Sequence, residues 1–283
     1  MRVVISRKGF DAAAGGTASP ILPSGEPASL PIPETRPTEE SALYDDLPCG
    51  PYSMGKVVRD LLPSGRLPKL QAHLDPDLNP ASRPRRRGWE AMFGQALAAE
   101  RHLQQEGVVA GDLILFFGWF RQTEMHDGRL RYVKGAPDLH LIFGWLQIAE
   151  RVPWEQTHVL PAWAADHPHC RARPYGKPDS IYRAAPALTV PGVPVGRAGA
   201  GLFKRVTSSR QLTAPGSSRS IWRLPRWFHP SVGDCCLTYH RQSERWQLGR
   251  DHALLKVVGR GQEFVLHNAP RGGLGEWLSE VFA

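Results

Sequence analysis

Two apolar runs near the middle of the sequence constrain the fold more than any other feature. They cover residues 113–121 and 139–152, and each contains the order Phe-Gly-Trp. Such runs are typical of β-strands, and the strongly apolar part, residues 113–120, is far shorter than the ~20 residues of a membrane-spanning helix. We expect two strands of one strongly curved sheet, and we leave open whether they pair. A glycine in each permits a bend or the close approach of another group.

Alternate residues of a strand share a face, so each run is expected to present a row of aromatic and polar side chains. One interpretation is that these aromatic residues belong only to the core. The other is that they form an aromatic wall that ends in two polar groups and lines a pocket. The residues concerned are Phe117, Trp119 and Arg121 on the first run, and Phe143, Trp145 and Gln147 on the second.

Helix-breaking residues decide the class of fold around these strands. The chain has 28 glycines and 26 prolines among 283 residues, about a fifth of the sequence, where about 12% is ordinary. A helical bundle cannot accommodate so many breakers. We therefore predict an α+β fold, a single domain over residues 1–283 with a dominant curved, mostly antiparallel sheet and few helices. A barrel-like closure of that sheet is left open, and long Gly/Pro-rich loops should pack over residues 8–68 and 153–200.

Apolar spacing places the other elements. Residues 89–106 have helical periodicity and end at Gly107, and residues 275–282 fit a second helix. A short helical turn is expected at residues 54–60. Further strands or extended pieces are expected at residues 3–5, 29–33, 180–182, 201–206, 235–240 and 263–266.

Charge and cysteine content indicate which ligands and which cellular compartment to expect. The net charge is +8, and arginine outnumbers lysine 28 to 7. Guanidinium groups suit phosphates and base edges, although a GC-rich genome explains arginine richness equally well. The four cysteines, Cys49, Cys170, Cys235 and Cys236, form no Cys-X-X-Cys pair, and the N-terminus lacks a signal-peptide core. We expect a cytoplasmic protein without a membrane segment.

Common catalytic motifs are missing from the sequence. It contains no phosphate-binding P-loop, dinucleotide-binding fingerprint, Gly-X-Ser-X-Gly elbow or His-Glu-X-X-His helix. The metal-like cluster is Asp166-His167-Pro168-His169-Cys170, which we interpret as a polar surface loop because no second ligand pair follows at ordinary spacing. The sequence therefore assigns no metal site and leaves any cofactor unknown.

Charged groups at the end of the first strand are candidates for anion binding. Arg7 and Lys8 could hold a phosphate or carboxylate, while Gly15 and Gly16 let backbone amides approach it. Asp11 follows them closely and is a candidate catalytic carboxylate of an enzyme that acts on a nucleotide or base. An ordinary exposed strand end is the competing interpretation.

Paired carboxylates supply the first catalytic candidates. Asp75 and Asp77 flank a proline and follow His73, and carboxylates so close together serve acid–base chemistry when one is desolvated. The competing interpretation is a simple turn, since Asp and Pro favour turns.

Polar and aromatic residues of the C-terminal third complete the candidate site. Arg219, Trp222 and Arg226 interleave cations with aromatic faces that can stack on bases, unless the tryptophans are core. His240 is a candidate general base, and Glu263 could orient it or act as an acid.

Many of these segments, in order, resemble the nucleotide modification associated domain 3 family. The segments are Ser6–Asp11, Gly15-Gly16, Ser19–Ile21, His73–Leu78, the two Phe-Gly-Trp runs, Ser220–Trp222, Leu224-Pro225, Tyr239-His240 and Gly261–Val265. The strand pair also resembles the small barrel of PUA-like and EVE domains, which read modified bases or RNA. Residues 12–14 are alanines, so no chemical role falls there.

The resemblance implies a role in a DNA or nucleotide base-modification system. DNA or a nucleotide is then the expected ligand, with other proteins of such a system as further partners. Three hypotheses follow: a protein that recognises a base or nucleotide, an enzyme that acts on one, and a non-catalytic scaffold. One cavity lined by Arg7, Asp11, Asp75, Asp77 and Glu263 would favour the enzyme, whereas a flat basic face would favour the binding protein.

Overall fold

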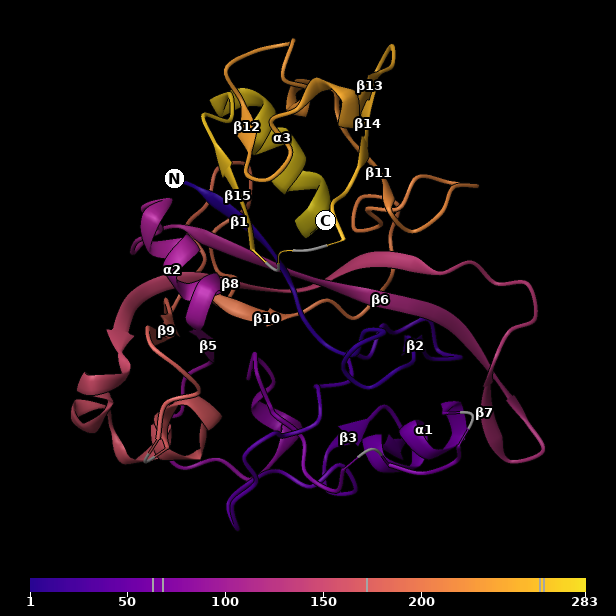
Figure 1. Cartoon of the computed structure of the whole chain (residues 1–283), viewed down its shortest axis with the longest axis vertical. Coiled ribbons are helices and arrows are strands. Elements are labelled where there is room, and N and C mark those ends of the chain that lie inside the picture. The colour runs from indigo at the N-terminus through magenta and orange to yellow at the C-terminus, as the bar shows by residue number, and fades with distance from the viewer. Residues whose placement is uncertain (63, 68, 172, 260, 262) are drawn as a thin grey trace.

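A ten-stranded sheet built around two long strands dominates the computed structural model of the protein (Figure 1). The structure describes residues 1–62, 64–67, 69–171, 173–259, 261 and 263–283. Strands β6 (Leu113–His126) and β8 (Leu139–Pro153) contain the two Phe-Gly-Trp runs and pair with each other in antiparallel register. The predicted strands are therefore confirmed, and their pairing, left open by the sequence, is settled.

The order of the strands gives an open, mixed sheet. It runs β12-β15-β1-β6-β8-β9-β5, with β2 and β7 attached to β6 and β10 attached to β8. Only β1 and β2 pair in parallel with β6, so the sheet is mostly antiparallel, as predicted. Among the described strands the path does not return on itself, and no barrel closes. The bounds are β1 (Val3–Arg7), β2 (Ser19–Ile21), β5 (Met92–Ala96), β7 (Arg129–Tyr132), β9 (Asp179–Ala184), β10 (Ala200–Leu202), β12 (Cys236–Leu237) and β15 (Glu263–His267).

A smaller layer covers one face of this sheet. Strands β11 (Ile221–Pro225), β14 (His252–Lys256) and β13 (Trp246–Leu248) form a three-stranded antiparallel sheet, which lies with helix α3 (Arg271–Phe282) in the upper part of Figure 1. Side chains of both sheets and of α3 share one hydrophobic cluster. The sequence analysis did not predict β11, β13 or β14 as strands, although α3 covers the C-terminal helix that it predicted.

The predicted helix over residues 89–106 is wrong in its first half. Residues Met92–Ala96 form strand β5, and helix α2 covers only Leu97–Gln105. β5 pairs with β9 along its whole length and buries Phe93 against Tyr182. Pairing with a distant strand thus overrides the local helical spacing, and Leu97, at φ 59°, marks the change of direction.

The Gly/Pro-rich loops pack as predicted. Phe10, Leu30 and Tyr44 are buried in a separate hydrophobic cluster under helix α1 (Met54–Leu61), which Ser53 caps. Residues 29–33 form no strand, although a short hairpin, β3 (Pro48–Cys49) and β4 (Tyr52–Ser53), lies nearby in the chain. Short 3₁₀ helices cover Pro80–Ser82, Trp154–Val159, Ala162–Asp166, Pro168–Cys170, Arg226–Phe228 and Ser243–Arg245. None of the described helices is both long and apolar enough to cross a membrane.

A bulge between β6 and β8 changes which side chains share a face. Phe116 pairs with Gly144, but Phe117 pairs with Ile142, so one residue of β8 is skipped. Phe143 and Trp145 consequently belong to different hydrophobic clusters, and the prediction that they share a face is wrong. The extra residue shifts the alternation by one position.

Candidate functional site

A polar cavity of about 140 Å³ lies where β1 ends, next to the parallel strand β6. The chain leaves β1 through Lys8, whose amide donates to the carbonyl of Phe117 at 2.8 Å. A Cβ atom at Gly118 would lie 2.7 Å from the carbonyl oxygen of Lys8, so only glycine permits this close approach. The charged and polar residues that line the cavity are Arg7, Lys8, Asp11, His73, Asp75, Gln95 and His169.

Asp75 lies in the wall of this cavity and is buried. Its Oδ1 accepts the amide of Gly94 at 2.6 Å and lies 3.3 Å from Nε2 of His167. Burial by itself would raise the pKa of Asp75, but the hydrogen bond with His167 and the nearby rings of His169 and His73 hold that pKa well below its ordinary value. Asp75 is therefore an ionised carboxylate inside the protein.

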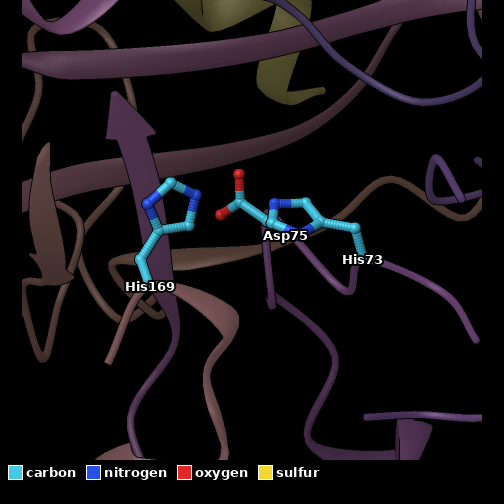
Figure 2. A group of neighbouring side chains, drawn as sticks. All are labelled: His73, Asp75 and His169. Carbon is cyan, nitrogen blue, oxygen red and sulfur yellow. The ribbon is translucent and has the colours of Figure 1, made fainter. Parts of the chain in front are cut away.

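Two histidines face Asp75 across the cavity. One ligand atom of each ring and one carboxylate oxygen of Asp75 all lie within 4.8 Å of one another, and Figure 2 shows the carboxylate beside both rings. His73 comes from the loop before β5, whereas His169 comes from the short helix Pro168–Cys170. A Cβ atom at Gly94 would lie 2.3 Å from the ring of His169, so this glycine makes room for the imidazole.

Each of these histidines is held from behind by a buried carboxylate. Nδ1 of His73 lies 3.1 Å from Oε2 of Glu34, and Nδ1 of His169 lies 2.6 Å from Oδ1 of Asp179. Glu34 also accepts hydrogen bonds from Tyr175. Burial opposes ionisation of Glu34, but the bonds from His73, the Arg36 amide and Tyr175 lower its pKa to about 2.

A buried ion pair forms another part of the wall. Nζ of Lys8 lies 3.0 Å from Oε1 of Glu263, which also accepts a bond from Gln95 Nε2. The side chain of Glu263 is fully buried, and its Oε2 has no hydrogen-bond partner among the described residues. The structure thus joins two sequence candidates, Lys8 and Glu263, in one ion pair.

Arg7 lines the cavity, and Arg219 and Trp119 form a cation–π pair outside its lining. Arg7 donates to the carbonyls of Val258 and Gly259 at 3.2 and 3.0 Å. Burial lowers the pKa of Arg7, Asp11 opposes that effect, and the nearby Arg219 adds to it. The guanidinium of Arg219 lies 4.0 Å from the centre of the Trp119 ring, a cation–π distance.

A second, larger cavity of about 300 Å³ borders the first. The two share Gly9 and Asp75, and the larger one is lined mainly by apolar side chains such as Phe143 and Leu202. Asp77 also lines it and is paired with both terminal nitrogens of Arg85, at 2.5 and 2.7 Å. Burial raises the pKa of Asp77, and Arg85 opposes that shift. Arg85 thus belongs to an internal ion pair.

The structure brings together many of the candidates predicted from the sequence. Arg7, Lys8, Asp11 and Asp75 line the polar cavity, Glu263 pairs with Lys8 there, and Asp77 lines the adjoining cavity. Asp11 also closes the turn that follows it, because its Oδ1 accepts the amides of Ala13 and Ala14 at 2.7 Å. Gly15 and Gly16 both adopt positive φ in this turn.

Other candidates lie outside the cavity. Trp145 and Trp222 are 5% and 0% exposed and pack in the core, so they present no open face for stacking. Gln147 bonds to the backbone of Thr189 and Gly111. Arg121 lies over the ring of Tyr132, 5.2 Å from its centre, whereas Arg226 is exposed in a short helix beyond β11.

His240 is a structural residue in this fold. Its Nδ1 donates to the carbonyl of Thr238 at 2.9 Å, and its Nε2 accepts the amide of Val258 at 3.1 Å. Burial lowers the pKa of His240 to about 4, against the opposing effect of the Thr238 bond. With both nitrogens engaged, the ring has no free position for a substrate. Gln262, next to Glu263 in the sequence, lies outside the described residues.

Sequence reasoning missed several residues of the site. The loop Asp166–Cys170 was interpreted as surface, but His167 and His169 are 1% and 5% exposed. His169 meets His73 and Asp75, almost a hundred residues earlier in the chain, and Glu34, Gln95 and Asp179 were not singled out at all. The signal available in the sequence was composition alone, since His73 lies two residues before Asp75 and His167 two residues before His169.

The fold and the cavity define an α+β protein with a buried polar site made of histidines, carboxylates and cations. The chain belongs to the nucleotide modification associated domain 3 family, whose model matches residues 2–267. The resemblance found in the sequence is thereby confirmed, and it places the protein in the context of nucleotide modification. No curated protein and no solved structure matches the chain significantly.

Proposed function

We propose that this protein is an enzyme that acts on a nucleotide, or on a base within a nucleic acid, at the polar cavity. The observation that carries the proposal is the convergence of Arg7, Asp11, Asp75, His73 and His169 on one cavity. A scaffold needs no such cavity, and a protein that only binds a polyanion needs cations without buried, oriented imidazole and carboxylate groups. Perturbed titratable groups facing a cavity are typical of catalytic sites.

The shape of the two cavities supports a nucleotide as substrate. The larger cavity has an apolar lining with a few polar groups, which suits a planar base. It meets the polar cavity at Asp75, so a base seated there would present its reactive edge to that carboxylate. Arg7 lies in the lining of the polar cavity, where its guanidinium suits a phosphate, whereas Lys8 beside it is paired with Glu263.

Arg219 and Trp119 add a second element of recognition. The guanidinium of Arg219 makes no side-chain hydrogen bond to the described residues and rests on the Trp119 ring. A cation that is held by an aromatic face but lacks a carboxylate partner remains available to a phosphate. Arg219 lies near enough to Arg7 to lower its pKa, so the two guanidinium groups are neighbours.

The test combines turnover with binding. Purified protein is incubated with nucleoside mono- and triphosphates and with DNA and RNA oligonucleotides carrying ordinary and modified bases, and mass spectrometry detects any change of mass. Asp75→Asn should reduce turnover by at least about 100-fold, the lower range for a group that takes part in chemistry. Asp77→Asn is a less specific test of catalysis. It also breaks the ion pair with Arg85, so a loss of activity could come from a change in structure.

Controls separate the enzyme from the two competing hypotheses. Arg219→Ala should weaken binding, because Arg219 neighbours Arg7, while Arg226→Ala, which replaces an exposed arginine in the short helix after β11, should not. Salt-sensitive binding of oligonucleotides without turnover of any substrate would instead support a binding protein. If the protein shows no turnover and no binding even at low salt, the proposal is refuted.

A further inference from the structure

The cluster of His73, Asp75 and His169 has the donor set of a metal centre. Two imidazole nitrogens and one carboxylate oxygen from distant parts of the chain lie within 4.8 Å of one another. Ligands of one transition-metal ion, each at about 2.1 Å from it, stand roughly 3–3.5 Å apart. A bound ion would therefore draw these atoms together by at most about 1.3–1.8 Å, which small side-chain rotations can supply.

The hydrogen bonds behind the two rings are an independent observation that points to a metal. A carboxylate can only accept a hydrogen bond, so Nδ1 of His73 and Nδ1 of His169 carry the protons shared with Glu34 and Asp179. A metal binds the neutral form of each ring, whose lone pair then lies on Nε2, and both residues line the cavity. Histidines that bind metals are held in this way by a carboxylate on the other nitrogen.

Asp75 is oriented to supply the third ligand. Its Oδ1 accepts the amide of Gly94 and lies near His167, whereas its Oδ2 accepts no hydrogen bond from the described residues. Since Asp75 lines both cavities, this second oxygen is available to an ion between the two rings. Gly94 makes the geometry possible, because any larger residue there would displace the ring of His169.

The charges around the cluster are compatible with a dication. Asp75, Glu34 and Asp179 bring three carboxylates, of which Glu34 is partly compensated by Arg171 at 3.2 Å. Of the two cations that line the cavity, Lys8 is paired with Glu263, and Arg7 donates to the carbonyls of Val258 and Gly259. A divalent ion thus enters a site with an excess of negative charge.

We propose that His73, Asp75 and His169 bind one divalent transition-metal ion through two imidazole nitrogens and one carboxylate oxygen. Imidazole with carboxylate suits the ions from Fe²⁺ to Zn²⁺ better than Mg²⁺ or Ca²⁺, which prefer oxygen alone. Three protein ligands leave coordination positions open, as in catalytic rather than structural centres. The site lies in the cavity of the proposed function, but the evidence for it is the geometry of its own residues.

The experiment measures metal binding without any nucleotide. The full chain is freed of metal with a chelator and titrated with Zn²⁺ by calorimetry and with Co²⁺ by visible absorption, which reports the ligand geometry. One equivalent of each ion should bind, and Zn²⁺ should displace Co²⁺. Failure of the folded wild-type chain to bind either ion stoichiometrically overturns the proposal, whatever the variants do.

Variants identify the ligands. His73→Ala, His169→Ala and Asp75→Asn should each abolish stoichiometric binding, while His158→Ala, which removes an exposed histidine, should bind like the wild type. Asp179→Asn leaves the three ligands in place and should weaken affinity by about 10–100-fold by releasing the ring of His169. Circular dichroism confirms that each variant is folded, and unchanged affinity in the folded Asp75→Asn chain refutes the assignment. A chain that binds the metal but alters no nucleotide would sustain this site and refute the proposed function.

Discussion

Breaking the ion pair of Lys8 and Glu263 should destabilise the protein strongly, because it leaves one buried charge without its partner. The Lys8 side chain is 10% exposed and that of Glu263 is fully buried, at a distance of 3.0 Å between Nζ and Oε1. Two unit charges at that separation attract by about 5 kcal/mol at an effective dielectric constant of about 20. Removal of one partner from a buried pair leaves the other charge uncompensated and costs about 3–5 kcal/mol.

The substitution Glu263→Gln is therefore expected to lower the free energy of unfolding by about 3–5 kcal/mol. Lys8→Met should also destabilise the protein. The double variant should be less destabilised than the sum of the single variants by about 2–3 kcal/mol, because it removes both buried charges together.

Urea denaturation followed by tryptophan fluorescence and circular dichroism measures these differences, provided that the two probes give coincident transitions. Glu124→Gln is the matched control, since it breaks the exposed pair of Glu124 and Arg131 at 2.9 Å and should cost less than about 1 kcal/mol. If the two single variants at the buried pair prove additive, or if Glu263→Gln costs no more than the control, the reasoning on this pair is wrong.

Three further predictions concern other parts of the fold. Since burial lowers the pKa of His240 to about 4, the unfolded chain takes up its proton first on acidification, so stability should fall between about pH 6.5 and pH 4; His240→Gln should flatten that part of a stability–pH curve measured by denaturation. Gly94→Ala should cost about 1–3 kcal/mol, because its Cβ would meet the ring of His169, and thermal unfolding tests this; wild-type stability would contradict the packing described. Arg219→Ala should weaken nucleotide binding by about 10–100-fold in fluorescence titrations, with Arg226→Ala as control, and equal effects of the two variants would exclude a specific role for Arg219.

The sequence predicted best those elements that local pattern defines. Four elements have a regular apolar pattern within their own residues, and the sequence predicted each of them. They are the two strands that contain Phe117 and Trp145, the first strand and the C-terminal helix. The failures have a common cause. Residues 92–96 have helical spacing but pair with β9, and β14 has a short, weak pattern that only its neighbours in the second sheet stabilise.

In the candidate site, too, the sequence predicted what depends on neighbouring residues and missed what depends on tertiary contacts. Arg7, Lys8, Asp11 and Asp75 were chosen from the sequence, because charged groups at strand ends and paired carboxylates are local signals. Trp222 and His240 looked equally promising, but their burial and their hydrogen bonds with His140 and the backbone could not be read from neighbouring residues.

By itself, the sequence determined the class of fold, the two central strands, the family and one side of the cavity, because each depends on residues close together in the chain. Only the tertiary structure brought His169 to His73 and Asp75, and placed Glu34 and Asp179 behind the two rings. Those contacts join segments far apart in sequence, and the packing of loops around β5 and β9 fixes them. Contacts between distant segments produce no periodic pattern in a single sequence. These contacts nevertheless decide which of the many polar residues can act together.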